Sequence, residues 1–165
     1  MLETAKAFGV SANSVSRHIV TATAKKLEDF QERDLSSFTP FAIFIDTLNR
    51  AGAAFMVSLG IDLNGIKQVL GFWEGATENN EVCKDLFADL ERRGIKLSKE
   101  IIWVTDGGIG VIKALKDRFG KKLIYQRCTI HKDRNIQRHV PKKYRRAAHR
   151  QFRTALEQTK YADAK

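Results

Sequence analysis

The alternation of apolar and polar residues predicts a sheet built from the middle of the chain. Three runs rich in β-branched and aromatic residues, FAIFID, AAFMVSLGI and KQVLGFW, occupy residues 41–46, 53–61 and 67–73. Turn-forming Asn-Arg-Ala-Gly and Asp-Leu-Asn-Gly segments separate them, as is typical of antiparallel neighbours. The pattern therefore predicts a three-stranded antiparallel meander whose first strand ends at or near Asp46.

Helical periodicity and further apolar runs follow the meander. Residues 77–94 carry apolar side chains three and four residues apart, with Thr77 placed to cap the helix and Gly94 placed to end it. The later elements alternate: a buried strand over 101–106, a helix over 109–120 and a short strand over 122–127. Three antiparallel strands followed by alternating strands and helices predict an α/β protein with an RNase H-like mixed sheet.

Helices flank this sheet on both sides in the sequence. Before the break SSFTP at 36–40, residues 2–8 and 12–32 fit two helices joined by a Gly-Val-Ser turn. After Thr129 the chain is again helical, and Pro141 begins a helix with one apolar stripe. The stripe consists of Tyr144, Ala148, Phe152 and Leu156. We divide the chain into a helix-turn-helix-like segment (1–35), a main segment with the RNase H-like sheet (36–140) and a basic helical segment (141–165).

Composition narrows the class of protein. With 43% hydrophobic and 29% charged residues, the chain is globular rather than disordered or fibrous, and its 165 residues suit one main domain. No run is long enough to span a membrane, and the first 30 residues lack the apolar core of a signal peptide. Two cysteines are too few for a disulfide framework. We therefore expect a cytoplasmic, nucleoid-associated protein with no membrane partner.

The positive charge is concentrated in the last part of the chain. The formal net charge is +10, and residues 121–165 hold 14 Lys and Arg against 3 Asp and Glu, whereas residues 1–120 hold 15 against 16. A single-sign block of this size indicates a polyanion such as DNA. The candidate phosphate contacts are Lys142, Lys143, Arg145, Arg146, Arg150 and Arg153. The alternative is a solvated basic helix that only aids solubility.

Two acidic residues matter because each closes a predicted strand. Asp46 closes FAIFID and Asp106 closes IIWVTD, so parallel neighbouring strands would bring both carboxylates to one edge. Close carboxylates repel each other unless a cation neutralises them, and oxygen ligands favour Mg²⁺ or Mn²⁺. Gly107 and Gly108 would let backbone or a phosphate approach such an ion without a Cβ in the way. Alternatively, Asp106 caps the helix over 109–119 and Asp46 is a turn acid.

The N-terminal stretch AKAFGVSANSVSRHI resembles the helix-turn-helix of DNA-binding proteins, whose second helix enters the major groove. Its candidate DNA contacts are Ser11, Asn13, Ser14 and Arg17. The alternative is an ordinary helical hairpin that packs on the domain.

In RCTIHK, Cys128 and His131 lie three residues apart at the start of a helix, where both could face one object. The chain offers no second Cys/His pair for a structural zinc. Packing of the helix and contact with DNA remain equal alternatives.

Several blocks together resemble the Mutator-type transposases of bacterial insertion sequences. The blocks are FAIFIDTL, QVLGFWEGATENNEVC, IIWVTDGGIGVIKAL and LIYQRCTIHKDRNIQRHVPK, and they agree in order and spacing over residues 36–165. The resemblance implies an RNase H-like domain with a DDE triad, of which Asp46 and Asp106 would be the first two acids holding Mg²⁺ or Mn²⁺. Cys128 and His131 would belong to the family's Cys-x-x-His signature. It also implies DNA cleavage and strand transfer at the ends of an insertion sequence, with double-stranded DNA as the partner.

Two departures from the family pattern change this expectation. Thr47 follows the first acid where the family commonly has Gly. The third acid of the family, a glutamate, lies beyond a long helical insertion, and Glu157 and Asp163 fall where that insertion begins. We therefore expect a catalytically incomplete fragment of an enzyme that forms a homo-oligomer when complete, with no small-molecule substrate.

Two other functions stay open at this stage. The first is a non-enzymatic helix-turn-helix regulator, in which Asp46 and Asp106 would lie far apart or act as caps. The second is an RNase H-like nuclease, which needs further acids within the chain.

Overall fold

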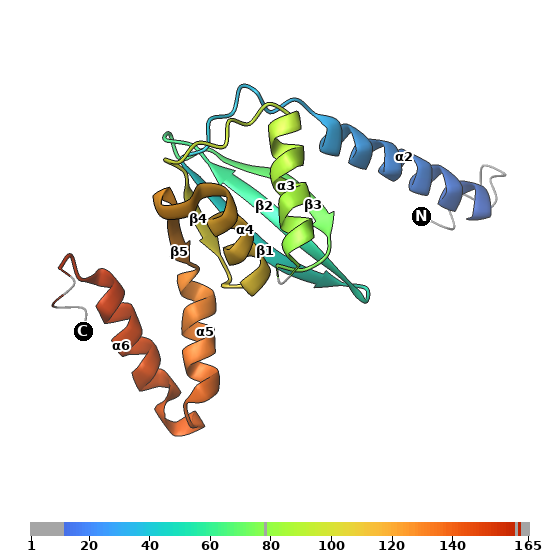
Figure 1. Ribbon diagram of the computed structural model, residues 1–165. Coiled ribbons are helices and arrows are strands. Elements are labelled where there is room, and N and C mark those ends of the chain that lie inside the picture. The colour runs from blue at the N-terminus through green and yellow to red at the C-terminus, as the bar shows by residue number, and fades with distance from the viewer. Residues whose placement is uncertain (1–11, 78, 161, 163–165) are drawn as a thin grey trace.

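The computed structural model of the protein describes residues 12–77, 79–160 and 162. The strands are β1 (Ala42–Arg50), β2 (Ala53–Ile61), β3 (Lys67–Glu74), β4 (Ile102–Thr105) and β5 (Ile124–Arg127). The helices are α2 (Ala12–Glu32), α3 (Asn80–Arg92), α4 (Ile109–Phe119), α5 (Thr129–His139) and α6 (Arg145–Glu157), with short 3-10 turns η1 (Gly120–Lys122) and η2 (Lys142–Tyr144). Figure 1 shows the helices arranged around one sheet.

The sheet is mixed, in the strand order β3-β2-β1-β4-β5. β1, β2 and β3 form an antiparallel meander, whereas β4 runs parallel to β1 and β5 runs parallel to β4. The crossovers that parallel strands require are supplied by α3 and α4. The predicted α/β class, the meander and the alternation after it are confirmed.

The predicted end of the first strand near Asp46 is wrong, because β1 continues to Arg50. Residues from Asp46 to Arg50 pair with β2, down to the pair Arg50 with Ala53. The two-residue turn between the strands has positive φ at Ala51 (51°) and Gly52 (83°), the backbone that matches the twist of a tight hairpin. The polar segment TLNR therefore extends the ladder instead of forming the turn.

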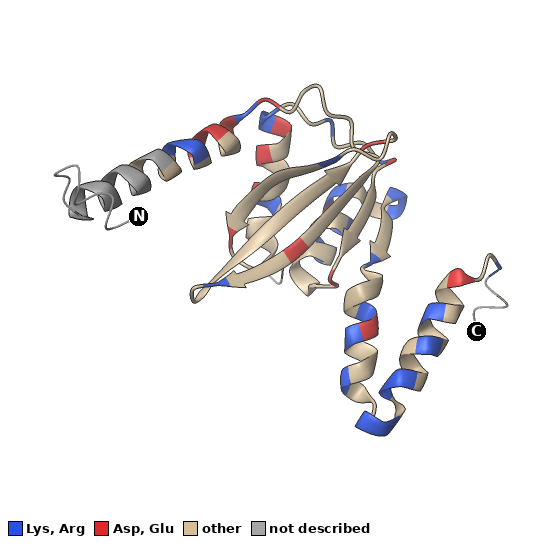
Figure 2. Ribbon diagram, turned by 180° about the vertical axis from the view of Figure 1, so that it is seen from behind, with Lys and Arg blue, Asp and Glu red and all other residues tan. Residues whose placement is uncertain are grey.

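The hydrophobic core lies between one face of the sheet and the helices α3 and α4 (Figures 1 and 2). Trp103 of β4 is its largest fully buried side chain, and its ring lies 5.3 Å from that of Phe87 and 5.5 Å from that of Phe119. The opposite face of the sheet, which Figure 2 shows from the front, is not covered by any helix of the described chain. The core thus holds β4 in place beneath the two helices, through the packing of Trp103 on Phe87 and Phe119.

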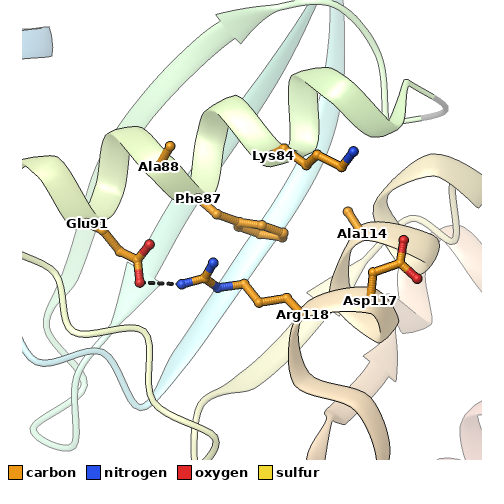
Figure 3. Close-up of a pocket in the computed structure, with 7 residues that line it drawn as sticks. All are labelled: Lys84, Phe87, Ala88, Glu91, Ala114, Asp117 and Arg118. Atoms are coloured by element: carbon orange, nitrogen blue, oxygen red, sulfur yellow. Dashed lines mark hydrogen bonds and ion pairs between the residues drawn. The ribbon is translucent and has the colours of Figure 1, made fainter.

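Charged residues border the contact between α3 and α4. In Figure 3, Arg118 of α4 reaches across Phe87 to form an ion pair with Glu91 of α3. Both charged side chains are partly exposed, at 37% and 41%, so water screens the pair and it adds little stability. The apolar contacts beneath it hold the two helices on the sheet.

The last turn of α2 is fastened to the sheet edge. Phe30 stacks on Phe72 of β3 at 6.1 Å, and the Gln31 side chain donates a 2.7 Å hydrogen bond to the Phe72 carbonyl. Glu32 forms an ion pair with Arg92 of α3 at 2.6 Å. The helix predicted over 12–32 is confirmed, and the helix and turn predicted over 2–11 lie outside the described residues.

The helices α5 and α6 form a hairpin that extends away from the sheet (Figure 1). Asp133 of α5 joins the two helices, since its Oδ2 lies 2.7 Å from Nδ1 of His149 on α6. Pro141 precedes the turn η2 rather than starting α6 directly, and α6 begins at Arg145. Of the predicted apolar stripe, Ala148 and Phe152 are half-buried, and the other two members stay exposed.

No helix among the described residues combines the length and the apolar composition needed to cross a membrane.

We expect Leu90→Ala to lower the free energy of unfolding by about 2–5 kcal/mol, because Leu90 is fully buried and its removal leaves a cavity in the core. The matched control is Leu63→Ala, since Leu63 is 81% exposed and its loss should change stability by less than about 0.5 kcal/mol. Urea denaturation measures both. Equal effects of the two substitutions would contradict the described core.

Candidate functional site

The register of β1 and β4 sets where the two candidate acids lie, at the C-terminal end of the β1–β4 pairing. The last parallel pair joins Ile45 to Thr105, so Asp46 and Asp106 each lie one residue beyond it. Ile45 and Thr105 are buried on the helix-covered face. Asp46, the next residue of β1, therefore points to the other face, because side chains alternate along a strand. Its side chain is 56% exposed.

Asp106 is held by hydrogen bonds to both of its carboxylate oxygens. The Thr77 hydroxyl donates to Oδ2 at 2.9 Å, and the backbone N–H of Gly108 donates to Oδ1 at 2.9 Å. The Arg127 side chain donates to the carbonyl oxygen of Asp106 at 3.2 Å. The N-cap of α4 is Gly108, without a side-chain capping bond, so Asp106 orders the loop before the helix and is not its N-cap.

The predicted cap of α3 at Thr77 is wrong, because Asn79 fills that role. The Asn79 side chain accepts from the backbone N–H groups of Glu81 (3.0 Å) and Val82 (3.5 Å). Thr77 is fully buried and its hydroxyl is turned to Asp106. Sequence reasoning missed this contact, since a threonine just before a helix has the same local pattern whether it caps the helix or reaches a distant acid.

Asp46 faces the start of α5. Its Oδ1 accepts the backbone N–H of Thr47 at 2.9 Å and lies 3.8 Å from Nε2 of His131. A hydrogen bond to β4 holds the start of α5 near Asp46: the N–H of Cys128 donates to the carbonyl of Thr105 at 2.7 Å. Of the Cys-x-x-His pair, Cys128 thus joins the helix start to β4 through its backbone, and His131 lies beside Asp46.

The two glycines after Asp106 make room for protein groups rather than open space. A Cβ at Gly108 would come within 2.5 Å of the Thr77 hydroxyl oxygen. A Cβ at Gly107, whose φ is +100°, would come within 2.6 Å of Nε of Arg127. Thr77 and Arg127 therefore border the Cβ positions of these glycines, and the approach of a phosphate past them stays a prediction.

The carboxylate oxygens of Asp46 and Asp106 are of the kind that a hard cation prefers, and His131 lies beside Asp46 only. Within the described ranges, no group of three or more His, Cys, Asp or Glu side chains is placed to hold a metal ion. Glu157 ends α6, and Asp163 lies outside the described residues.

The predicted phosphate contacts lie on η2 and α6. Lys142, Lys143, Arg146, Arg150 and Arg153 are exposed, and Arg145 is half-buried and donates to the Val140 carbonyl at 3.2 Å. Figure 2 shows Lys and Arg along this hairpin with few acidic residues between them. Asn13, Ser14 and Arg17 fall in the first half of α2, and Ser11 lies outside the described residues.

Comparison with known proteins shows the family of the chain. The family model described as Transposase, Mutator family, matches residues 1–165. The chain belongs to the Mutator family of transposases. The resemblance inferred from the sequence blocks is thereby confirmed.

Curated relatives of this Mutator-family chain carry transposase names. It is 28% identical to the transposase for insertion sequence element IS6120 of Mycolicibacterium smegmatis, over 81% of this chain and 42% of that protein. It is 31% identical to the ISRM5 transposase of Rhizobium meliloti, over 81% of this chain and 34% of that protein. It is 28% identical to the IS256 transposase of Staphylococcus aureus, over 79% of this chain and 36% of that protein. The chain thus spans well under half the length of these relatives.

We expect Asn79→Ala to lower the free energy of unfolding by about 1 kcal/mol, because two N–H groups at the start of α3 lose their acceptor. Asn49→Ala is the control, since Asn49 is exposed in β1 and caps no helix. Thermal unfolding followed by circular dichroism measures both variants. A null effect at Asn79 would contradict the capping role.

Proposed function

We propose that the chain forms part of the catalytic domain of a DDE-type transposase, which cleaves DNA at the ends of an insertion sequence and joins it to a target. The observation that carries the proposal is the β1–β4 register in a chain of this family, since Asp46 and Asp106 each directly follow the last parallel pair, Ile45 with Thr105. Asp46 and Asp106 would be the first two acids of the triad. The relatives' names support the reaction class, since each is a transposase for an insertion sequence.

The sheet supports an RNase H-like reading of the domain. An antiparallel meander followed by two parallel strands, in the order β3-β2-β1-β4-β5, is the pattern expected for that fold from the sequence. The first acid lies on the central strand β1 and the second directly after its neighbour β4. Strands at the centre of a sheet are held on both sides, so they suit residues that need fixed positions.

The donor set fits Mg²⁺ or Mn²⁺. Both residues offer carboxylate oxygens, which hard divalent cations prefer. The two hydrogen bonds to Asp106 use only part of its accepting capacity, because an ionised carboxylate has about four lone-pair sites. Asp46 and Asp106 would hold such an ion, and the chemistry supplied there would be activation of the attacking hydroxyl and stabilisation of the leaving oxygen of the phosphodiester.

The protein's own groups would orient the DNA and the acids. Asp46 and Asp106 would hold the ion, with His131 beside Asp46 and Arg127 behind the Asp106 loop. The exposed Lys and Arg side chains of η2 and α6 would bind phosphates and supply affinity without sequence choice. Sequence-specific contacts would come from the N-terminal segment that includes Asn13, Ser14 and Arg17, in a homo-oligomer of the complete protein.

The proposal assigns two acids of the triad. Because no third acid joins Asp46 and Asp106 in a metal-binding group among the described residues, we expect little strand transfer by this chain alone. The alternative of a regulator without catalysis has less support, since it requires the two acids to be far apart or to act as caps, and Gly108 is the N-cap of α4.

We expect Mn²⁺ to bind the wild-type chain, and Asp46→Asn or Asp106→Asn to abolish binding, because each substitution removes a charged oxygen ligand from the same ion. Calorimetric titration with Mn²⁺ measures this. Asp117→Asn is the control, since Asp117 is exposed on α4. Equal binding by wild type and both site variants would exclude the metal site.

We expect the double variant Arg146→Ala/Arg150→Ala to bind duplex DNA more weakly, with the slope of log K against log salt reduced by about 2, since each lost phosphate contact lowers it by about 1. Fluorescence anisotropy over a salt series measures the slope. The control is Lys96→Ala/Lys99→Ala, which removes two exposed charges between α3 and β4. An unchanged slope in the α6 variant would show that this surface does not contact phosphates.

A further inference from the structure

A short series of hydrogen bonds connects β1 to Asp106 through a buried threonine. The Thr47 hydroxyl donates to the Thr77 hydroxyl oxygen at 3.0 Å, and the Thr77 hydroxyl donates to Oδ2 of Asp106 at 2.9 Å. The backbone N–H of Thr77 returns a 3.1 Å hydrogen bond to the Thr47 hydroxyl oxygen. The residue after the first acid is thus joined to the second acid.

The direction of these bonds is set by the number of protons available. An ionised carboxylate only accepts, so the proton between Thr77 and Asp106 belongs to Thr77. A hydroxyl has one proton, and therefore the proton between Thr47 and Thr77 belongs to Thr47. The Thr47 oxygen in turn accepts from the Thr77 backbone. Every donor in this series has an acceptor, and the series ends on the carboxylate.

Thr77 has little freedom to move away from Asp106. It is fully buried, and its carbonyl accepts the N–H of Val111 in α4 at 2.7 Å, while its own N–H is bound to Thr47. The absence of a side chain at Gly108 permits this approach, since a Cβ there would lie 2.5 Å from the Thr77 hydroxyl oxygen. Backbone, side chain and neighbouring glycine all keep the hydroxyl on the acid.

A hydrogen bond in this position controls how a carboxylate presents its free lone pairs. Bonds to an ionised acceptor are shorter and stronger than neutral ones, and burial strengthens them further. Partners that orient a ligating carboxylate commonly change metal affinity 10–100-fold when removed. Thr77 occupies one lone-pair site of Oδ2 and the Gly108 N–H one of Oδ1, so about two of the four sites remain for a ligand.

We propose that Thr77 is a positioning residue that fixes the Asp106 carboxylate for a divalent cation, and that Thr47 holds Thr77 in this role. This inference rests on the proposed function, because it concerns how the same site is built. It gives a physical role to Thr47, the residue after the first acid, and to Thr77, which does not cap α3.

The first test needs no metal. We expect the Asp106 side chain to hold one χ1 rotamer in the wild type, in Thr77→Ser and in Ser58→Ala, and to average over rotamers in Thr77→Val, as measured by three-bond couplings in NMR. Ser58→Ala is the matched control, since Ser58 is fully buried and its hydroxyl has no hydrogen-bond partner among the described residues. An averaged rotamer in the wild type, or an ordered one in Thr77→Val, would overturn the positioning role.

The second test is calorimetric titration of the same proteins with Mn²⁺. We expect Kd to rise about 10–100-fold in Thr77→Val and to stay near the wild-type value in Thr77→Ser and Ser58→Ala. Thr47→Val, which removes the support but leaves Thr77 and Asp106, should raise Kd by a smaller factor and covers the case in which Thr77→Val does not fold.

The outcomes separate this inference from the function on which it rests. Wild-type affinity in folded Thr77→Val, with Mn²⁺ bound by the wild type, would overturn the role of Thr77 alone. No Mn²⁺ binding by the wild type would overturn the metal-dependent function, and with it the purpose assigned to Thr77.

Discussion

The parallel pairing of β1 with β4 is the constraint on which the candidate site depends. Ile45 pairs with Thr105, and an acid follows each of them in the sequence, Asp46 and Asp106. The pairing therefore sets where the two acids lie relative to each other. The same Thr105 accepts the N–H of Cys128 through its carbonyl, so the start of α5 is brought to this edge as well. A slip of one residue in β1 would turn Asp46 into the apolar core and expose Ile45, which burial strongly disfavours. The hydrophobic pattern of β1 therefore fixes the position of its carboxylate.

The core can hold this register without help from an ion. Burial of each large apolar side chain contributes about 1.5–3 kcal/mol, and the core includes Ile43, Ile45 and Trp103 on the two paired strands. Two carboxylates 4 Å apart in water repel by only about 1 kcal/mol. Since the Asp46 side chain is 56% exposed, water screens its charge. If Asp46 and Asp106 hold a cation, as proposed, the fold would therefore position them before the cation binds.

Sequence patterns predicted the parts of the fold that depend on local periodicity. The meander, the alternation after it and the helix α3 follow from apolar spacing and turn residues, and the family resemblance rested on contiguous blocks. The end of β1 was missed because the hairpin turn uses Ala51 at positive φ, which composition does not reveal. The role of Thr77 was missed because its partners, Thr47 and Asp106, lie 30 and 29 residues away along the chain. Contacts of that separation appear only when three elements meet.

Under the proposed function, the same geometry would separate the residues for chemistry from those that bind DNA. The acids, Thr77 and His131 gather where β1, the loop after β4 and the first turn of α5 meet. The exposed basic side chains lie on η2 and α6, at the far end of α5 and on the helix that returns beside it (Figures 1 and 2). Phosphate contacts on α6 would therefore act through α5, whose first turn carries His131 beside Asp46. A rigid α5 between the basic surface and the acids would orient bound DNA relative to the acids. The residues that bind phosphates and the residues that would carry out the reaction are therefore different, but the same helix connects them.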